Sequence, residues 1–203
     1  MKQNKIVFLF CGVESTGKST SVELANKYLK EKGLNVKVVG EVGRDISVGS
    51  GGVDSMSLFD YEHILFSHQA NFLSAYGSDC QVILLDTDSI YTRYYLEKDE
   101  TLLSSNKELS HNLIQLAGDI VKLNLKNSRI TKLIYLNSDC PFVQDGTRTY
   151  EKTRKQDDSI LLNLYKKSYD DKLISIVDGK DFALRFEKIK EIINETLAKE
   201  TDR

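Results

Sequence analysis

A short glycine-rich segment near the N-terminus carries the clearest chemical signature in the chain. The run Gly12-Val13-Glu14-Ser15-Thr16-Gly17-Lys18-Ser19 fits the pattern G-x-x-x-x-G-K-[ST] at every fixed position. In such a loop, backbone N–H groups and the N-terminus of the following helix point at phosphate oxygens. The glycines let the chain curl without Cβ clashes, the lysine reaches the β- and γ-phosphates, and the last hydroxyl is a Mg²⁺ ligand. The segment therefore predicts a binding site for a nucleoside triphosphate and Mg²⁺.

The elements on either side of this loop support the phosphate-binding interpretation. An apolar run from Ile6 to Cys11 predicts a buried strand, and Lys18 to Lys32 has the spacing of an amphipathic helix. A chance match in an ordinary turn is the alternative, but the motif requires a strand before it and a helix after it. The predicted nucleotide contacts within the loop are Gly12, Glu14, Ser15, Thr16, Gly17, Lys18, Ser19 and Thr20.

A second candidate for metal chemistry lies at the end of another apolar run, Val82-Ile83-Leu84-Leu85-Asp86. In phosphate-loop proteins a carboxylate at this place holds Mg²⁺ directly or through water. Asp86 is therefore the predicted metal-linked acid, acting with Ser19. Asp88 is a further candidate, for the metal or for the substrate. The alternative is that one of these aspartates caps the following helix.

Glu41 and Arg44 are the candidates for contact with a phosphoryl acceptor. They follow the second predicted strand, at the carboxyl edge where ligands of open α/β sheets bind. A carboxylate at this place can orient or deprotonate an acceptor hydroxyl that must be aligned with the γ-phosphorus. The alternative interpretation is an exposed loop carboxylate with a surface cation nearby.

The polar segment at about 141–156 is predicted to be a lid. It contains the turn-forming pair Asp145-Gly146 and several cations, of which Arg148 is the preferred functional residue and Arg154 a second candidate. A lid of this kind brings an arginine to the transferring phosphoryl group and excludes water. The alternative is a solvated charge run, since acidic residues largely balance the cations.

Apolar runs alternate with amphipathic stretches along the whole chain, which predicts one α/β domain over residues 1–203. The predicted strands are 6–11, 35–39, 81–85, 132–136 and 173–177. The predicted helices include 18–32, a stripe through Tyr61 to Tyr76 with a capping start at Ser57, about 106–126, 159–169 and a last helix through Phe182 to Leu197. Residues 42–54 are glycine-rich and are predicted to be a loop. The expected fold is a three-layer sandwich, a five-stranded parallel sheet with helices on both faces.

Composition excludes several functional classes. The 203 residues carry a formal net charge of −2, which argues against a protein that coats nucleic acid or an anionic membrane. Cys11, Cys80 and Cys140 form no C-x-x-C pair, so they are interpreted as reduced cytoplasmic thiols. The first apolar run is too short for a signal peptide and lacks a cleavage site. The expected partners are ATP and a small molecule.

Taken together, these segments resemble the ribosylnicotinamide kinase domain of the NadR family. The shared set is Gly12 to Ser19, Glu41-x-Gly43-Arg44, Asp86-Thr87-Asp88, Pro141 to Arg148 and Val177-Asp178-Gly179, in matching order over nearly the whole chain. The resemblance implies ATP- and Mg²⁺-dependent phosphorylation of the 5′-hydroxyl of nicotinamide riboside, which gives nicotinamide mononucleotide. It further implies that Glu41 and Arg44 line the acceptor site and that Asp145-Gly146-x-Arg148 is the lid. It also implies that Asp178 and Gly179 border the adenine.

The chain also departs from that family. Its three histidines form no H-x-G-H type motif and no residues remain for the adenylyltransferase and repressor domains of the full family protein, so both activities are expected to be absent. Phe142 and Gln144 stand in the lid where a Trp and an acid are expected. Tyr91, Tyr94 and Tyr95 are candidates to stack on a cationic nicotinamide ring, although helix packing explains them equally well. Another nucleoside or nucleotide kinase, or an ATP-binding regulatory ATPase, remains an alternative.

Overall fold

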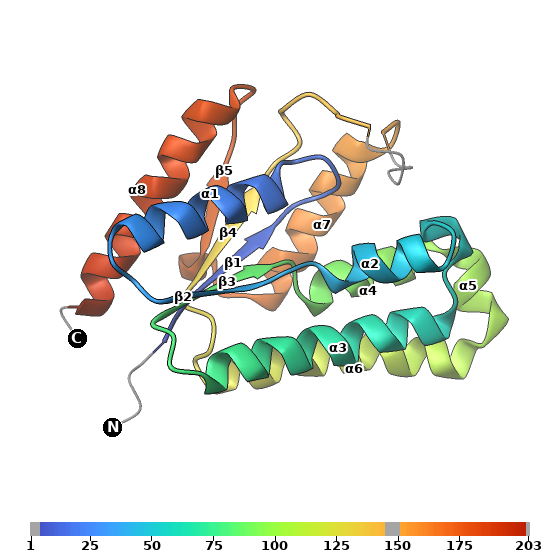
Figure 1. The fold of residues 1–203 in the computed structure, drawn as a ribbon. Coiled ribbons are helices and arrows are strands. Elements are labelled where there is room, and N and C mark those ends of the chain that lie inside the picture. The colour runs from blue at the N-terminus through green and yellow to red at the C-terminus, as the bar shows by residue number, and fades with distance from the viewer. Residues whose placement is uncertain (1–4, 145–150, 202–203) are drawn as a thin grey trace.

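In a computed structural model, which describes residues 5–144 and 151–201, the chain folds around a parallel five-stranded sheet (Figure 1). The strands are β1 (Ile6–Cys11), β2 (Val36–Val39), β3 (Val82–Asp86), β4 (Lys132–Leu136) and β5 (Ile174–Val177). They lie in the order β2-β3-β1-β4-β5, and every neighbouring pair is parallel. This order places β1 at the centre of the sheet, between β3 and β4.

Helices connect the strands and cover both faces of the sheet. They are α1 (Lys18–Glu31), α2 (Val42–Gly49), α3 (Leu58–Gly77), α4 (Ser89–Lys98), α5 (Glu100–Ser105), α6 (Lys107–Lys126), α7 (Arg154–Ser168) and α8 (Phe182–Thr201). Two short 3-10 helices, η1 (Val53–Ser55) and η2 (Asp171–Leu173), complete the described elements. The predicted fold class, a parallel sheet with helices on both faces, is confirmed.

The side-chain alternation of β1 explains the layers. Phe8 and Phe10 point to one face and pack with α1 and α8, while Val7 and Leu9 point to the other face. All four side chains are completely buried. Figure 1 shows α1 and α8 over one face, with α3, α4, α6 and α7 on the other. A strand that is apolar on both sides can only lie inside such a sandwich, which is why the sequence run predicted a central strand.

Local signals account for the start of α3. The Ser57 hydroxyl accepts from the backbone N–H of Asp60, and the Asp60 carboxylate accepts from the backbone N–H of Ser57. This is the reciprocal capping arrangement that the sequence predicted at Ser57. Two hydrogen bonds from Ser57 lower the pKa of Asp60. The bond from the Ser57 backbone N–H has the larger effect, and the bond from the Ser57 hydroxyl adds to it.

The prediction of a loop over residues 42–54 was wrong. Residues Val42–Gly49 form α2 and Val53–Ser55 form η1. Glycines disfavour helices in isolation, but α2 packs against α3, and tertiary contact outweighs a propensity cost of about 1 kcal/mol per glycine. The turn falls instead at Gly51 and Gly52, both with positive φ. Helix α7 also begins at Arg154, five residues before the predicted start.

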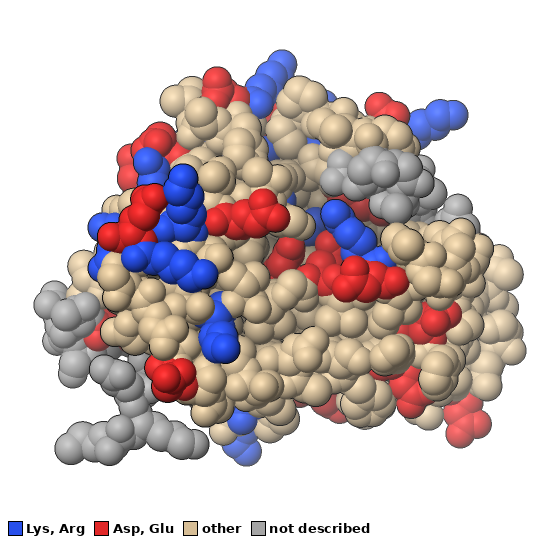
Figure 2. Space-filling model, viewed as in Figure 1, with Lys and Arg blue, Asp and Glu red and all other residues tan. Residues whose placement is uncertain are grey.

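Among the described residues, no helix is both long enough and apolar enough to cross a membrane. On the face shown in Figure 2, acidic and basic side chains are interspersed among uncharged residues. This pattern agrees with the balanced charge of the sequence.

Candidate active site

The phosphate loop connects the central strand β1 to α1, and two glycines make its path possible. Gly12 has φ +140°, and a Cβ there would lie 2.2 Å from the backbone oxygen of Leu136. Gly17 has φ +82° and forms the left-handed N-cap of α1. A Cβ on Gly17 would lie 2.7 Å from the ring of Phe182, so the first residue of α8 packs directly on the loop. Any side chain at either position would clash, in a backbone region that L-residues rarely adopt.

Lys18 lies at the first position of α1 with its side chain folded under the loop. Its Nζ donates to the backbone oxygen of Val13 at 3.0 Å and lies 4.8 Å from the centre of the Tyr91 ring. The Thr16 hydroxyl donates to the same oxygen at 2.9 Å. Lys18 is only 6% exposed. The charge is therefore held at the loop interior, where a phosphate chain bound by the loop amides would lie.

Two carboxylates meet across the carboxyl edge of the sheet. Asp86 ends β3 and is 3% exposed, and its Oδ1 has no hydrogen-bond partner among the described residues. Burial, and then the charge of Glu41, raise the pKa of Asp86 to about 6, against the opposing effects of Lys18, the Ser19 hydroxyl and Arg44. Glu41 lies at the N-cap of α2 with Arg44 one turn later, 3.9 Å from Glu41 Oε2 to Arg44 Nη2.

The donor set at this edge suits a hard divalent cation. A buried carboxylate oxygen without a partner, a second carboxylate and the Ser19 hydroxyl are all oxygen ligands. The described residues contain no group of three or more His, Cys, Asp or Glu side chains that could hold a metal. Mg²⁺ is usually held by one or two carboxylates together with substrate phosphates, so Asp86 and Ser19 fit Mg²⁺ better than a metal that needs a protein-only cage.

A pocket extends from the phosphate loop towards α3 and α4. It is lined by residues 14–20 of the loop and by Glu41 and Arg44 of the α2 region. Its other lining residues are mainly apolar and aromatic: Val53, Met56, Tyr61, Ile64, His68, Tyr91, Thr92 and Tyr95. The predicted acceptor residues Glu41 and Arg44 therefore share one pocket with the phosphate loop and with aromatic side chains, and Tyr91 lies against Lys18. That arrangement suits the transfer of a phosphoryl group to a ring-bearing small molecule.

A protein-family model described as an AAA domain matches residues 7–178. The chain belongs to this AAA domain family. No curated protein is detectably similar to it in sequence.

Solved structures of kinases share the fold of this AAA domain. NadR in complex with NR has a TM-score of 0.74 at 18% identity, over 95% of this chain and 50% of that chain. NadR in complex with NAD and AMP-PNP has a TM-score of 0.69 at 17% identity, over 95% of this chain and 49% of that chain. Thymidylate kinase from Ehrlichia chaffeensis has a TM-score of 0.63 at 12% identity, over 94% of this chain and 99% of that chain. The chain thus spans about half the length of the NadR chains and has the P-loop kinase fold.

The predicted lid, at about residues 141–156, is described only at its two ends. The predicted lid residues Asp145, Gly146 and Arg148 lie outside the described residues. Arg154, the other lid arginine, begins α7 and is 7% exposed. Its guanidinium donates to the backbone oxygens of Glu14 at 3.1 Å, Ser15 at 2.9 Å and Cys140 at 2.7 Å. Arg154 therefore joins α7 and the segment at Cys140 to the phosphate loop.

Asp88 lies outside the pocket just described. It caps α4 by accepting from the Ile90 backbone N–H at 3.0 Å, and it also accepts from the hydroxyls of Tyr165 at 2.8 Å and Tyr169 at 2.6 Å. Burial raises the pKa of Asp88, and the two tyrosine hydroxyls oppose this effect. The geometry favours the capping alternative for Asp88, in which its carboxylate joins β3 and α4 to α7.

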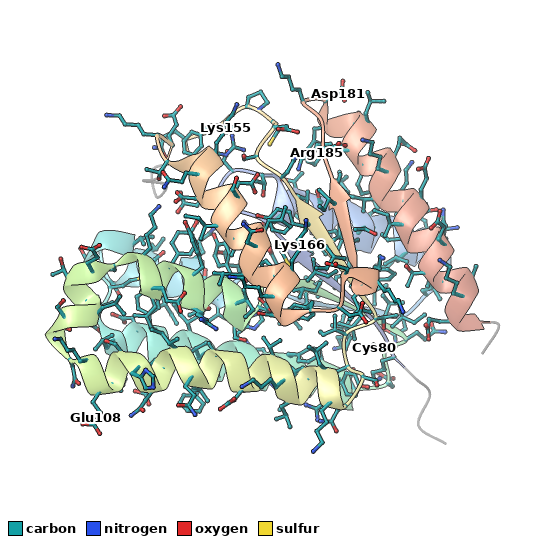
Figure 3. The ribbon with its side chains drawn as sticks, turned by 180° about the vertical axis from the view of Figure 1, so that it is seen from behind. Cys80, Glu108, Lys155, Lys166, Asp181 and Arg185 are labelled. Carbon is teal, nitrogen blue, oxygen red and sulfur yellow. The ribbon has the colours of Figure 1, made fainter. Side chains whose placement is uncertain are left out.

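Asp178 and Gly179, predicted to border an adenine, follow β5. Asp178 is exposed and forms an ion pair with Lys188, and Gly179 has φ +107°. The buried Arg185 of α8 lies close by and donates to the backbone oxygen of Asn137 at 3.0 Å (Figure 3). Neither Asp178 nor Gly179 lines the pocket at the phosphate loop.

Several pocket residues escaped sequence reasoning. Ser47 and Val53 belong to the segment predicted as a loop, and Tyr61 and His68 belong to a helical stripe interpreted as core. Thr87 lines the pocket with φ +67°, an unusual backbone for a β-branched residue. Of the three candidate tyrosines, Tyr91 and Tyr95 line the pocket, whereas the Tyr94 hydroxyl donates to Asp157 at 2.6 Å.

Proposed function

We propose that the protein is an ATP- and Mg²⁺-dependent kinase that phosphorylates the 5′-hydroxyl of nicotinamide riboside to give nicotinamide mononucleotide. The observation that carries this proposal is a single pocket lined by the phosphate loop, by Glu41 and by aromatic side chains. A ribose seated at Glu41 would direct its 5′-hydroxyl towards the loop and its ring towards the tyrosines. Aromatic faces suit a cationic pyridinium ring.

The predicted site residues have distinct roles in the proposed reaction. Lys18 and the loop amides hold the phosphates, and Glu41 orients or deprotonates the acceptor hydroxyl. Ser19 and Asp86 are the residues that would hold Mg²⁺, which would supply positive charge at the phosphates. Arg44 lies beside Glu41, where it supports the acceptor site. Arg148 is proposed to reach the transferring phosphoryl group from the lid, and Asp178 and Gly179 to border the adenine.

One structural neighbour has been solved with this nucleoside. NadR has been crystallised with NR, nicotinamide riboside, and with the ATP analogue AMP-PNP, and its fold covers nearly all of this chain. At 18% identity that likeness extends to the fold alone. The choice of nicotinamide riboside therefore depends on the pocket, and direct assay must test it.

Coupled measurement of ADP release tests the proposal, with a panel of nucleosides as acceptors. Nicotinamide riboside should stimulate ADP release, and mass spectrometry should find its monophosphate. The Lys18→Ala variant should lose at least about a hundredfold in kcat while keeping its melting curve, because Lys18 contributes charge at the phosphates. Equal ADP release with and without nicotinamide riboside would exclude it as the acceptor.

A nucleotide kinase is the second candidate, favoured by the thymidylate kinase likeness, which spans 99% of that chain. A nucleoside monophosphate would need a cation at its phosphate, and Arg44, about half exposed in the pocket wall, is available for it. Thymidine monophosphate therefore belongs in the same acceptor panel. Stimulation by the monophosphate and not by nucleosides would select this second function.

A further inference from the structure

The outer face of α3 carries a stripe of exposed apolar side chains. Phe59, Phe66 and Leu73 recur every seven residues along this helix and are 71%, 56% and 41% exposed. His63 and Ala70, which are also exposed, lie between them on the same side of the helix. The opposite side of α3 is buried in the domain. The alternating spacing of four and three residues is that of a helix that packs along its length against another helix.

This face also lacks charge over most of its length. Residues 63–77 contain no Lys, Arg, Asp or Glu, although a surface helix ordinarily presents such residues to solvent. Charged side chains surround this region, but Figure 2 shows a broad area without acidic or basic side chains over the middle of α3. Single exposed apolar side chains are common, whereas a contiguous stripe of them on an uncharged face marks an interaction surface.

The charges near the stripe differ between the two ends of α3. Asp60 and Glu62 lie near its N-terminus. At the other end, the Cζ of Arg129 lies 5.8 Å from the centre of the Tyr76 ring, and the Nζ of Lys5 donates to backbone oxygens just beyond the helix. Two antiparallel copies of α3 would therefore place the acidic end of each against the basic end of the other. Parallel copies would place like charges together.

A second copy of this chain suits the stripe better than a membrane does. Helices that lie on membranes combine an apolar face with Lys and Arg on the polar face, whereas the charged residues of α3 are Asp60 and Glu62. The stripe is also complementary to itself, because Phe59 and Leu73 are equally far from Phe66 along the helix. A two-fold axis at Phe66 therefore places every large side chain of the stripe opposite another one.

We propose that the protein forms a two-fold symmetric homodimer in which the outer faces of α3 pack antiparallel to each other, with Phe66 at the axis. Phe66 then contacts its own counterpart, and Phe59 contacts Leu73 of the second copy. This inference is independent of the proposed function, because the pocket residues Tyr61 and Ile64 lie on the other side of α3. The two pocket walls are then held together through the dimer.

Sedimentation velocity of the 203-residue chain at about 1–100 μM tests the oligomeric state. We expect a species of twice the 23.0 kDa chain mass. Phe66→Glu should raise the dissociation constant at least about a hundredfold, because each dimer loses two buried phenylalanine rings and gains two facing carboxylates. Leu73→Glu should weaken the dimer as well. Leu184→Glu is the matched control, at an exposed position of α8 across the sheet from α3 (Figure 1), and should remain dimeric.

Cysteine cross-linking tests the orientation of the two helices. Residue 66 faces itself in the antiparallel pair, so Phe66→Cys should form a disulfide-linked dimer on mild oxidation. Position 59 faces position 73, so Phe59→Cys should form a cross-link only when it is mixed with Leu73→Cys. The wild type gives the background, since its three cysteines are buried or half-buried.

Three results would overturn the proposal. The first is a monomeric chain over the whole concentration range, and the second is a dimer that Phe66→Glu and Leu73→Glu leave intact while their melting curves show folded protein. The third is cross-linking of Phe59→Cys with itself as efficient as that of Phe66→Cys, which would require parallel helices. None of these results depends on kinase activity, so the dimer and the proposed function stand or fall separately.

Discussion

The side chain of Arg154 donates from Nε to the backbone carbonyl of Glu14 at 3.1 Å, across 140 residues of chain. The same guanidinium donates to the carbonyls of Ser15 and Cys140, and its Cζ lies 5.7 Å from the centre of the Phe142 ring. The bonds join the first residue of α7 to the loop proposed to bind phosphate. A displacement of the α7 N-terminus must therefore break them or move the loop.

Replacement of Arg154 should destabilise the protein and weaken ATP binding together. Arg154→Met keeps most of the buried stem but removes three charge-assisted hydrogen bonds, so we expect a loss of about 2–4 kcal/mol in unfolding free energy. Urea unfolding and calorimetric titration with AMP-PNP measure the two effects. Lys155→Met, at the exposed neighbouring position near the start of α7 in Figure 3, is the matched control and should change neither. Equal behaviour of the two variants would show that the Arg154 contacts contribute nothing.

Gly12→Ala should abolish nucleotide binding. The new Cβ would lie 2.2 Å from the Leu136 oxygen, and the φ of +140° is strained for alanine. Both effects together should lower the free energy of unfolding by at least about 3 kcal/mol and move the loop away from β4. Thermal melting with and without AMP-PNP reports both changes. Gly77→Ala, in open space at the end of α3, should be neutral or slightly stabilising. Normal AMP-PNP binding by Gly12→Ala would contradict the tight loop geometry.

Asp86→Asn should remove the effect of Mg²⁺ on ATP binding without lowering the stability of the ligand-free protein. Burial and the Glu41 charge disfavour ionised Asp86, as its raised pKa shows, so above pH 6 a neutral side chain relieves that repulsion. The measurement is the thermal shift with ATP, with and without Mg²⁺. In the control variant Asp79→Asn, at an exposed position, Mg²⁺ should raise the melting temperature with ATP as much as in the wild type. If Mg²⁺ raised the melting temperature of ATP-bound Asp86→Asn as much as that of the wild type, Asp86 would not be a metal ligand.

Asp157 should make the stability of the fold sensitive to acid. Burial favours a higher pKa, but hydrogen bonds from Lys98, Thr153 and Tyr94 outweigh it, and the pKa falls below its ordinary 3.8. A lowered folded-state pKa gives stability that is complete above about pH 3.8 and is lost as the pH falls through the folded value. Asp157→Asn should therefore be less stable than wild type near pH 7, with the difference shrinking below pH 4. Denaturant unfolding across that range tests this, with the exposed Asp171→Asn as control.

The parts of this fold that sequence predicted best are those where one local rule decides. The strand at Lys132–Leu136 matches its predicted range, because the apolar run of residues 133–136, bounded by polar residues, has few alternatives. The glycine spacing of the phosphate loop likewise requires one backbone path. The prediction for the α2 segment was wrong because α2 is stabilised by packing on α3. The residues of the segment itself do not indicate that contact.

The candidate site divides in the same way. Motif spacing identified Lys18, Ser19, Glu41 and Asp86, which the fold brings to one edge of the sheet. His68 escaped because a histidine on the apolar face of a helix has the spacing of a core residue, and only the folded structure places it in the pocket lining. Arg154 was underestimated because its partners are backbone carbonyls, which no side-chain pattern reveals.

The central place of β1 has a consequence for how the protein could change over time. Because β1 is paired on both sides, amide hydrogens such as those of Phe8 and Phe10 should exchange with solvent only when the whole domain unfolds. The phosphate loop thus extends from the part of the molecule that opens least. The opposite pocket wall is built from η1 and α3, which form no strand pairs. Substitutions in that wall can alter which small molecule fits the pocket while the phosphate loop keeps its shape, so one scaffold can diverge in the ligands that it takes.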